Sequence, residues 1–121
     1  MEPPSQGLLI GIVGPCGSGK STLLTGLEKR GYIGRHIAQE HSYVQAMWQL
    51  ITRPDILIYL HASFPISTRR SQLDWQEKDY DEQLRRLAHA RGHADLSIET
   101  DDLTPEQVLQ KALDFLIRNN S

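Results

Sequence analysis

Residues 14–21 read Gly-Pro-Cys-Gly-Ser-Gly-Lys-Ser, and no other stretch of the chain constrains the fold as strongly. The spacing is G-x-x-x-x-G-K-[ST], in which the glycines allow the backbone to point several N–H groups toward one place. Those N–H groups, the N-terminus of a following helix and the charge of Lys20 suit a polyphosphate, and the hydroxyl of Ser21 suits Mg²⁺. The stretch therefore predicts a phosphate-binding loop between a strand and a helix.

The residues on either side of this loop have the required pattern. Residues 8–13 form a short apolar run, as in a parallel strand that is buried on both faces. Residues 22–30 place leucines at helical spacing, end in two basic residues and are followed by Gly31, which is typical of a helix C-terminus. We therefore interpret the loop as a Walker A motif for a nucleoside triphosphate. The residues expected to bind the nucleotide are Gly14, Pro15, Cys16, Gly17, Ser18, Gly19, Lys20, Ser21 and Thr22.

Bulk properties limit the partners and the location. The length of 121 residues predicts one domain, residues 1–121, with disorder expected at 1–6 and 119–121. A net charge of −2 without a basic block argues against nucleic acid or an anionic membrane as a partner. The apolar stretches are far shorter than the roughly 18–20 residues that span a bilayer. The acidic, proline-rich start is unlike a secretory signal, so a cytoplasmic protein is expected, and its single cysteine excludes an internal disulfide.

The rest of the chain alternates short apolar runs with helical periods, which predicts an α/β fold. We expect a three-layer α/β/α sandwich with a small, mostly parallel, doubly wound sheet of about four strands. In such sheets, ligands bind outside the carboxyl ends of the strands. The expected strands are residues 8–13, 32–39, 55–60 and 94–99. The expected helices are residues 22–30, 42–52, 64–70, 80–92 and 104–117.

Several segments together resemble the P-loop kinase group, whose members include thymidylate, deoxynucleoside, shikimate and adenylylsulfate kinases. They are the phosphate loop, the phrase Pro-Asp-Ile-Leu-Ile-Tyr-Leu at residues 54–60, the arginines after it and residues 94–106. The resemblance covers most of the chain in order, but only the phosphate loop is highly specific. It implies a P-loop NTPase fold and the use of Mg²⁺ with ATP.

The resemblance also implies roles for residues beyond the loop. Arg69 and Arg70 match the start of a lid that closes on the nucleotide, and arginine suits a moving phosphoryl group. A solvated helix face is the alternative for these two arginines. Asp101 lies in the segment 100–102, which matches the loop that holds the adenine ring.

The chain departs from this group in two features, the acidic residue that binds Mg²⁺ and the length of the segment after the first helix. In members of the group, a strand ends in an acidic residue, and this residue holds Mg²⁺ through water. The present chain has no long apolar strand that ends in Asp. If the strand expected at 32–39 lies beside the first strand, Glu40 faces Ser21 and can serve as the metal acid or base. The alternative for Glu40 is an ordinary turn residue. The helical pair that binds the acceptor in nucleotide kinases is absent, because only residues 31–35 separate the first helix from the second strand.

Other residues have two interpretations. Cys16 is either an oxidation-prone thiol or, as we favour, a small residue that fits the turn. Trp48 or Trp75 could stack on a base, although Trp48 fits the core side of its expected helix better. His89 and His93 have the i, i+4 spacing of zinc ligands, but hydrogen bonding at a helix C-terminus is favoured.

Two functions fit these observations. In the first, the chain is a kinase that uses Mg-ATP, with Lys20, Arg69 and Arg70 stabilising the moving phosphoryl group. Ser21 and Glu40 would hold Mg²⁺, and the acceptor would be a small metabolite, nucleoside or nucleotide. In the second, the chain is a nucleotide-binding regulatory module with weak turnover or none. An ABC-type ATPase is excluded by length and by the lack of an LSGGQ-like motif, and a Ras-like GTPase by the lack of [NT]-K-x-D. The acceptor, the choice of ATP or GTP, and a homodimer stay open.

Overall fold

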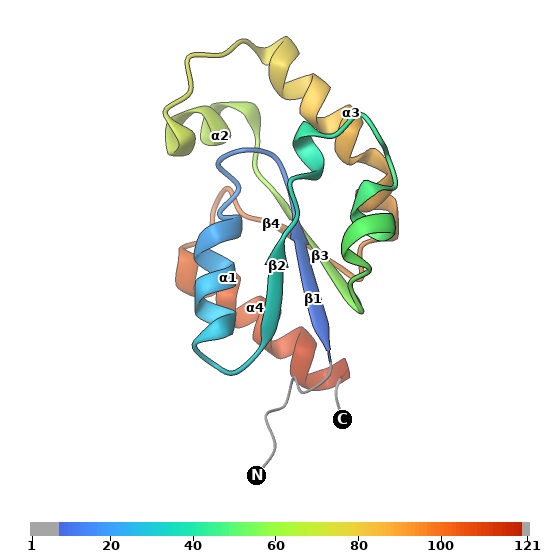
Figure 1. Ribbon diagram of the computed structural model, residues 1–121. Helices are drawn as coiled ribbons and strands as arrows, with labels where there is room; N and C mark the ends of the chain where they lie inside the picture. Colours follow the sequence, from blue (N-terminus) through green and yellow to red (C-terminus); the bar gives the residue numbers. More distant parts are fainter. Residues whose placement is uncertain (1–7, 120–121) are drawn as a thin grey trace.

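The computed structural model describes residues 8–119, which form a β-sheet with helices packed against both of its faces (Figure 1). The disorder expected at residues 1–6 and at the last two residues lies outside the described part of the chain. Asn119, also expected to be disordered, is the last residue of a helix.

The sheet has four strands, all parallel, in the order β2-β1-β3-β4. The strands are β1 (Leu9–Val13), β2 (Ile33–His36), β3 (Ile56–His61) and β4 (Leu96–Glu99). Gly11 of β1 lies opposite Arg35 of β2 on one side and Leu57 of β3 on the other. The predicted α/β fold with about four mostly parallel strands is thereby confirmed, and the carboxyl ends of all four strands meet at one edge of the sheet.

The α-helices begin and end within about three residues of the predicted bounds 22–30, 64–70, 80–92 and 104–117. They are α1 (Lys20–Glu28), α2 (Phe64–Ser71), α3 (Glu77–His93) and α4 (Pro105–Asn119), with a short 3₁₀ turn η1 (Gln39–His41) and a π-helix η2 (Trp48–Thr52). The predicted capping box of α4 is confirmed: Gln107 N donates to Thr104 Oγ1 at 3.1 Å, and Thr104 N donates to Gln107 Oε1 at 2.9 Å.

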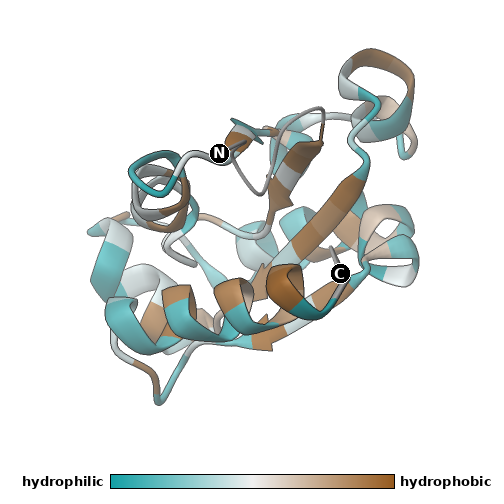
Figure 2. Ribbon diagram, turned by 90° about the horizontal axis from the view of Figure 1, so that it is seen from below, coloured by the Kyte–Doolittle hydropathy of each residue, from teal (hydrophilic) through white to brown (hydrophobic). Residues whose placement is uncertain are grey.

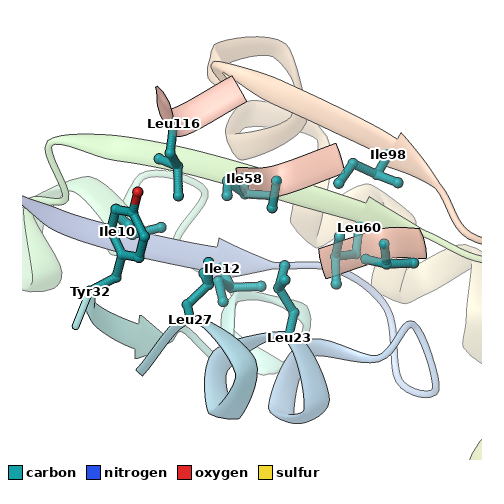
Figure 3. Close-up of a cluster of buried hydrophobic side chains, with 11 residues drawn as sticks. Ile10, Ile12, Leu23, Leu27, Tyr32, Ile58, Leu60, Ile98 and Leu116 are labelled. Atoms are coloured by element: carbon teal, nitrogen blue, oxygen red, sulfur yellow. The ribbon is translucent and has the colours of Figure 1, made fainter. Parts of the chain in front are cut away.

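Two hydrophobic clusters lie on opposite faces of the sheet, because successive side chains of a strand point to opposite sides. Ile58 and Leu60 of β3 join the cluster covered by α1 and α4, which Figure 3 shows in close-up. Leu57 and Tyr59 join the other cluster, with Trp48 and side chains of α3. Figure 2 colours the ribbon by hydropathy, with brown, hydrophobic segments in the strands and with brown and teal residues alternating along the helices. This arrangement leaves the carboxyl edge of the sheet free for a site.

The helix predicted over residues 42–52 is wrong in its first half. Only η2, Trp48–Thr52, is helical, and Val44 is 55% exposed although the pattern predicted a buried position. The reason is Gln39, whose buried side chain bonds the backbone in place of a helical turn. Its Nε2 donates to Val44 O at 2.8 Å, and its Oε1 accepts from Trp48 N at 2.9 Å. Long-range hydrogen bonding has replaced the local helix preference here.

Candidate functional site

The glycine loop, residues 14–19, runs from the carboxyl end of β1 to α1. Gly17 has a φ of 78°, and a Cβ added to it would lie 2.4 Å from Ser67 O, so the loop packs directly against α2. Gly19, with a φ of 98°, is the N-cap of α1, and among the described residues no side chain caps this helix end. The first N–H groups of α1 are therefore open to an anion, as the sequence predicts for a phosphate loop.

The ammonium group of Lys20 lies inside the glycine loop rather than in solvent. Its Nζ donates to Gly14 O at 2.7 Å and to Pro15 O at 3.1 Å, and it pairs with Glu40 Oε2 at 3.0 Å. These three acceptors match the three donors of an ammonium group. The side chains of Lys20 and Glu40 are only 6% and 4% exposed, so this is a buried ion pair.

Glu40 reaches Lys20 because β2 lies directly beside β1, which is the condition that the sequence prediction set. The η1 turn places the carboxylate beneath the loop, and its second oxygen, Oε1, is buried without a hydrogen-bond partner among the described residues. Leaving a buried carboxylate oxygen unpaired costs free energy. An unpaired oxygen of this kind is therefore a candidate ligand atom for a cation.

Two pockets border the glycine loop in the described part of the chain, one on each side. The Leu103 pocket has a volume of about 380 Å³, and the Glu40 pocket has about 370 Å³. Both include loop residues Gly17 and Gly19 and the first-turn residue Thr22. The other residues of the Leu103 pocket are Ser18, Leu23, Arg70, Thr100, Leu103, Pro105 and Val108. The other residues of the Glu40 pocket are Cys16, Lys20, Ser21, His36, Glu40 and His41.

The two arginines of α2 have different positions. Arg70 lines the Leu103 pocket, where it donates to Thr100 Oγ1 at 2.9 Å and to Thr100 O at 2.8 Å, and its Nη1 also lies 3.5 Å from Gly17 O. Arg69 is exposed and lies outside both pockets as residues 8–119 define them. Of the two arginines predicted for the site, the structure brings only Arg70 to the glycine loop. Thr100, its partner, lies in the segment 100–102 that the resemblance matched to the adenine loop, but its bonds to Arg70 were not expected.

Asp101 lies next to the Leu103 pocket rather than in it. Its Oδ1 accepts a hydrogen bond from Ser63 N at 2.9 Å, and Ser63 is the N-cap of α2. Burial opposes the charged form, but the hydrogen bonds from Ser63 and the nearby positive charges outweigh it, so the pKa of Asp101 lies below its ordinary value. Asp101 thus connects the loop after β4 to the start of α2, the helix that carries Arg70.

His36, at the end of β2, lines the Glu40 pocket and was not expected there. Burial and then the positive charge of Lys20 lower the pKa of His36, whereas the charge of Glu40 acts in the opposite direction. The imidazole is therefore neutral near pH 7. A neutral imidazole can accept a hydrogen bond from a molecule in the pocket.

Gln83 of α3 fixes the position of Cys16 at the top of the glycine loop. Cys16 N donates to Gln83 Oε1 at 3.0 Å, and Gln83 Nε2 donates to Cys16 Sγ at 3.2 Å. The thiol also lies 3.9 Å from His41 Nε2. The sequence predicted neither partner of Cys16. Gln83 lies 67 residues away in the chain, and of the adjacent residues Glu40 and His41 only Glu40 was considered for the site.

The aromatic and histidine residues weighed as alternatives lie outside both pockets. Trp48 is buried in the core, as favoured, and its Nε1 donates to His89 Nδ1 at 3.0 Å. Trp75 donates from Nε1 to Thr68 Oγ1 at 2.7 Å and packs against neighbouring aromatic rings. His93 Nδ1 lies 2.8 Å from His89 O at the end of α3, which agrees with the favoured hydrogen bonding at a helix C-terminus.

Comparisons with protein-family models and with curated proteins found no match for this chain. None of the helices within residues 8–119 combines the length and the hydrophobicity that crossing a bilayer requires.

Proposed function

We propose that the chain has the P-loop NTPase fold and is a small, cytoplasmic, kinase-like phosphotransferase that uses Mg-ATP. The observation that carries this proposal is the pair of pockets on the two sides of a loop with Walker A spacing. A triphosphate lying along the loop would place its base in one pocket and its terminal phosphate in the other. Each pocket falls in the size range of small-molecule sites, which is about 300–1,000 Å³.

The Leu103 pocket suits the base and the sugar of the nucleotide. Its walls include the apolar side chains of Leu23, Leu103 and Val108, which can cover the flat faces of a base. Arg70 lies next to the glycine loop in the same pocket, where its guanidinium group would bind the phosphates of the nucleotide.

The Glu40 pocket suits the terminal phosphate, the metal ion and the acceptor. A phosphate oxygen that approaches Lys20 would replace Gly14 O or Pro15 O as an acceptor of its N–H donors. Ser21 and Glu40 line the same pocket, and the unpaired Oε1 of Glu40 can face Mg²⁺ directly or through water. The acceptor would lie in the same pocket and would be a small metabolite, nucleoside or nucleotide.

One observation favours the second candidate, a nucleotide-binding regulatory module with little turnover. Within residues 8–119, no arginine lines the Glu40 pocket, because Arg69 lies outside it and Arg70 lines the opposite one. Phosphoryl transfer gains much of its rate from such a charge on the moving group. In this case the chain would bind Mg-ATP without transferring its phosphate efficiently.

Thermal unfolding with and without nucleotide tests binding, on which both candidates depend. We expect Mg-ATP at millimolar concentration to raise the melting temperature of the wild-type chain. Lys20→Met should lose this rise, whereas Lys29→Met, an exposed lysine just after the same helix, should keep it. A wild-type melting temperature that does not respond to Mg-ATP would contradict both candidates.

Phosphoryl transfer from ATP labelled at the γ-position separates the two candidates. A panel of nucleosides, nucleotides and small alcohols is incubated with the chain and Mg-ATP, and labelled products are resolved. A labelled acceptor supports the kinase. Nucleotide binding without any labelled product supports the regulatory module.

A further inference from the structure

Three potential metal ligands of different chemistry meet at the rim of the Glu40 pocket. They are the thiol of Cys16, a carboxylate oxygen of Glu40 and the imidazole of His41, whose ligand atoms all lie within 4.8 Å of one another. Cys16 Sγ is 3.9 Å from His41 Nε2, and that nitrogen is 3.8 Å from Glu40 Oε2. In a tetrahedral zinc site, with bonds of about 2.3 Å to sulfur and 2.0–2.2 Å to nitrogen or oxygen, such ligands are separated by about 3.3–3.6 Å. The two separations measured from His41 Nε2 exceed these values by only a few tenths of an ångström.

An independent observation is that the buried carboxylate of this cluster has an oxygen left unpaired by the described residues. Glu40 is 97% buried, since only 3% of its surface is exposed, and its Oε1 has no hydrogen-bond partner among residues 8–119. Its other oxygen already pairs with Lys20. The carboxylate can therefore bind a metal ion through Oε2, which also pairs with Lys20, or through the unpaired Oε1 after a rotation of the group.

The other two ligands can adjust to the same ion. The side chain of His41 is 59% exposed, so its imidazole can rotate at the rim of the pocket without disturbing the core. Cys16 is also held by Gln83 of α3, whose Nε2 donates to the sulfur. A neighbouring group that orients a ligand in this way is usual around metal sites.

We propose that Cys16, Glu40 and His41 form a Zn²⁺ site at the rim of the Glu40 pocket. Sulfur, nitrogen and carboxylate oxygen together suit Zn²⁺, whereas Mg²⁺ prefers oxygen ligands alone. Three protein ligands leave the fourth position open toward the pocket, where a water molecule or a phosphate oxygen can bind. The site needs no nucleotide, so it can be tested without one, although it uses the same Glu40 carboxylate that the proposed function assigns to Mg²⁺.

Titration of the chelator-treated chain with Co²⁺, a spectroscopic substitute for Zn²⁺, tests the site. We expect a thiolate-to-Co²⁺ charge-transfer band that saturates at one Co²⁺ per chain. The band should disappear when added Zn²⁺ displaces the bound Co²⁺. Cys16→Ser should remove the band, and His41→Ala should weaken Co²⁺ and Zn²⁺ binding at least about 10-fold. The control His93→Ala, an exposed histidine on α3, should bind as the wild type does. No band in the wild type, or unchanged affinity in His41→Ala, would overturn the proposal.

Alkylation of the wild-type chain provides a test that needs no variant. The sequence has one cysteine, so the rate of reaction with iodoacetamide reports on Cys16 alone. Stoichiometric Zn²⁺ should slow this reaction at least about 10-fold, because the metal-bound sulfur is a weaker nucleophile, and Mg²⁺ should not. An alkylation rate that Zn²⁺ leaves unchanged would contradict the site even if Cys16→Ser did not fold.

Discussion

The Leu103 pocket is walled by apolar side chains from α1, α4 and the segment before α4, whereas the Glu40 pocket is walled by charged and titratable groups that follow β1 and β2. The two pockets share the glycine loop between them. The Leu103 pocket depends on hydrophobic packing. The Glu40 pocket depends on the buried ion pair of Lys20 and Glu40, and removing either charge leaves the other one buried without a counter-charge. Changes on the Glu40 side should therefore alter folding and metal dependence, and changes on the Leu103 side should alter the affinity for the base.

The largest effect is expected when the ion pair is broken from one side. Lys20→Met leaves the buried carboxylate of Glu40 without its counter-charge and should lower the free energy of unfolding by about 3 kcal/mol. Urea denaturation without nucleotide measures this. The double variant Lys20→Met/Glu40→Gln removes both charges and should recover most of the loss. A single variant within about 0.5 kcal/mol of the wild type would show that the pair does not support the fold.

A smaller effect is expected at the glycine that borders both pockets. Gly17→Ala combines a left-handed backbone with a Cβ only 2.4 Å from Ser67 O, and should cost at least about 2 kcal/mol of stability. Gly19→Ala is the matched control, because its φ is also positive but nothing lies within 4 Å of the added Cβ. It should cost about 1 kcal/mol in chemical denaturation. Equal losses for the two variants would rule out the contact with α2 as the cause.

The Leu103 side should respond through affinity rather than stability. Leu103→Ala removes part of the apolar wall, and we expect ATP to bind about fivefold more weakly, or about 1 kcal/mol. Inorganic tripolyphosphate, which has no base, should bind as before. Ser21→Ala, on the other side, should weaken the Mg²⁺-dependent binding of both ligands. Calorimetric titration measures these affinities, and equal losses of ATP and tripolyphosphate in Leu103→Ala would contradict the assignment of the base.

The smallest effect is expected from Asp101 and appears only in acid. Because the pKa of Asp101 is lower in the folded chain than in the unfolded chain, its contribution to stability is complete above the ordinary aspartate pKa of about 4. It disappears as the pH falls through the lowered folded-state pKa. Asp101→Asn should therefore lose less stability than the wild type below about pH 4, as measured by denaturation at a series of pH values. The exposed neighbour variant Asp102→Asn should follow the wild-type curve.

The sequence predicted those parts of the chain whose structure depends on residues adjacent in the sequence. Strands β1 and β3 are continuous apolar runs, and the start of α4 is specified by a capping box within four residues. The segment 42–52 could not be predicted, because its apolar spacing favours a helix that the buried Gln39 side chain prevents. Nothing in the local pattern shows that a glutamine outside the segment will bond its backbone.

The candidate site also combines features that depend on adjacent residues with contacts between residues far apart in the chain. The motif at residues 14–21 predicted a loop with the N-terminus of a helix open to an anion, because glycine freedom and helix capping are properties of adjacent residues. The contacts that shape the pockets join residues far apart in the chain: Lys20 with Glu40, and Arg70 with Thr100. These contacts exist because β2 and β3 pair with β1, and β4 with β3, so that the carboxyl ends of all four strands meet at one edge. Strand order depends on how the whole chain packs its two hydrophobic clusters, so only the tertiary structure could place Glu40 against Lys20.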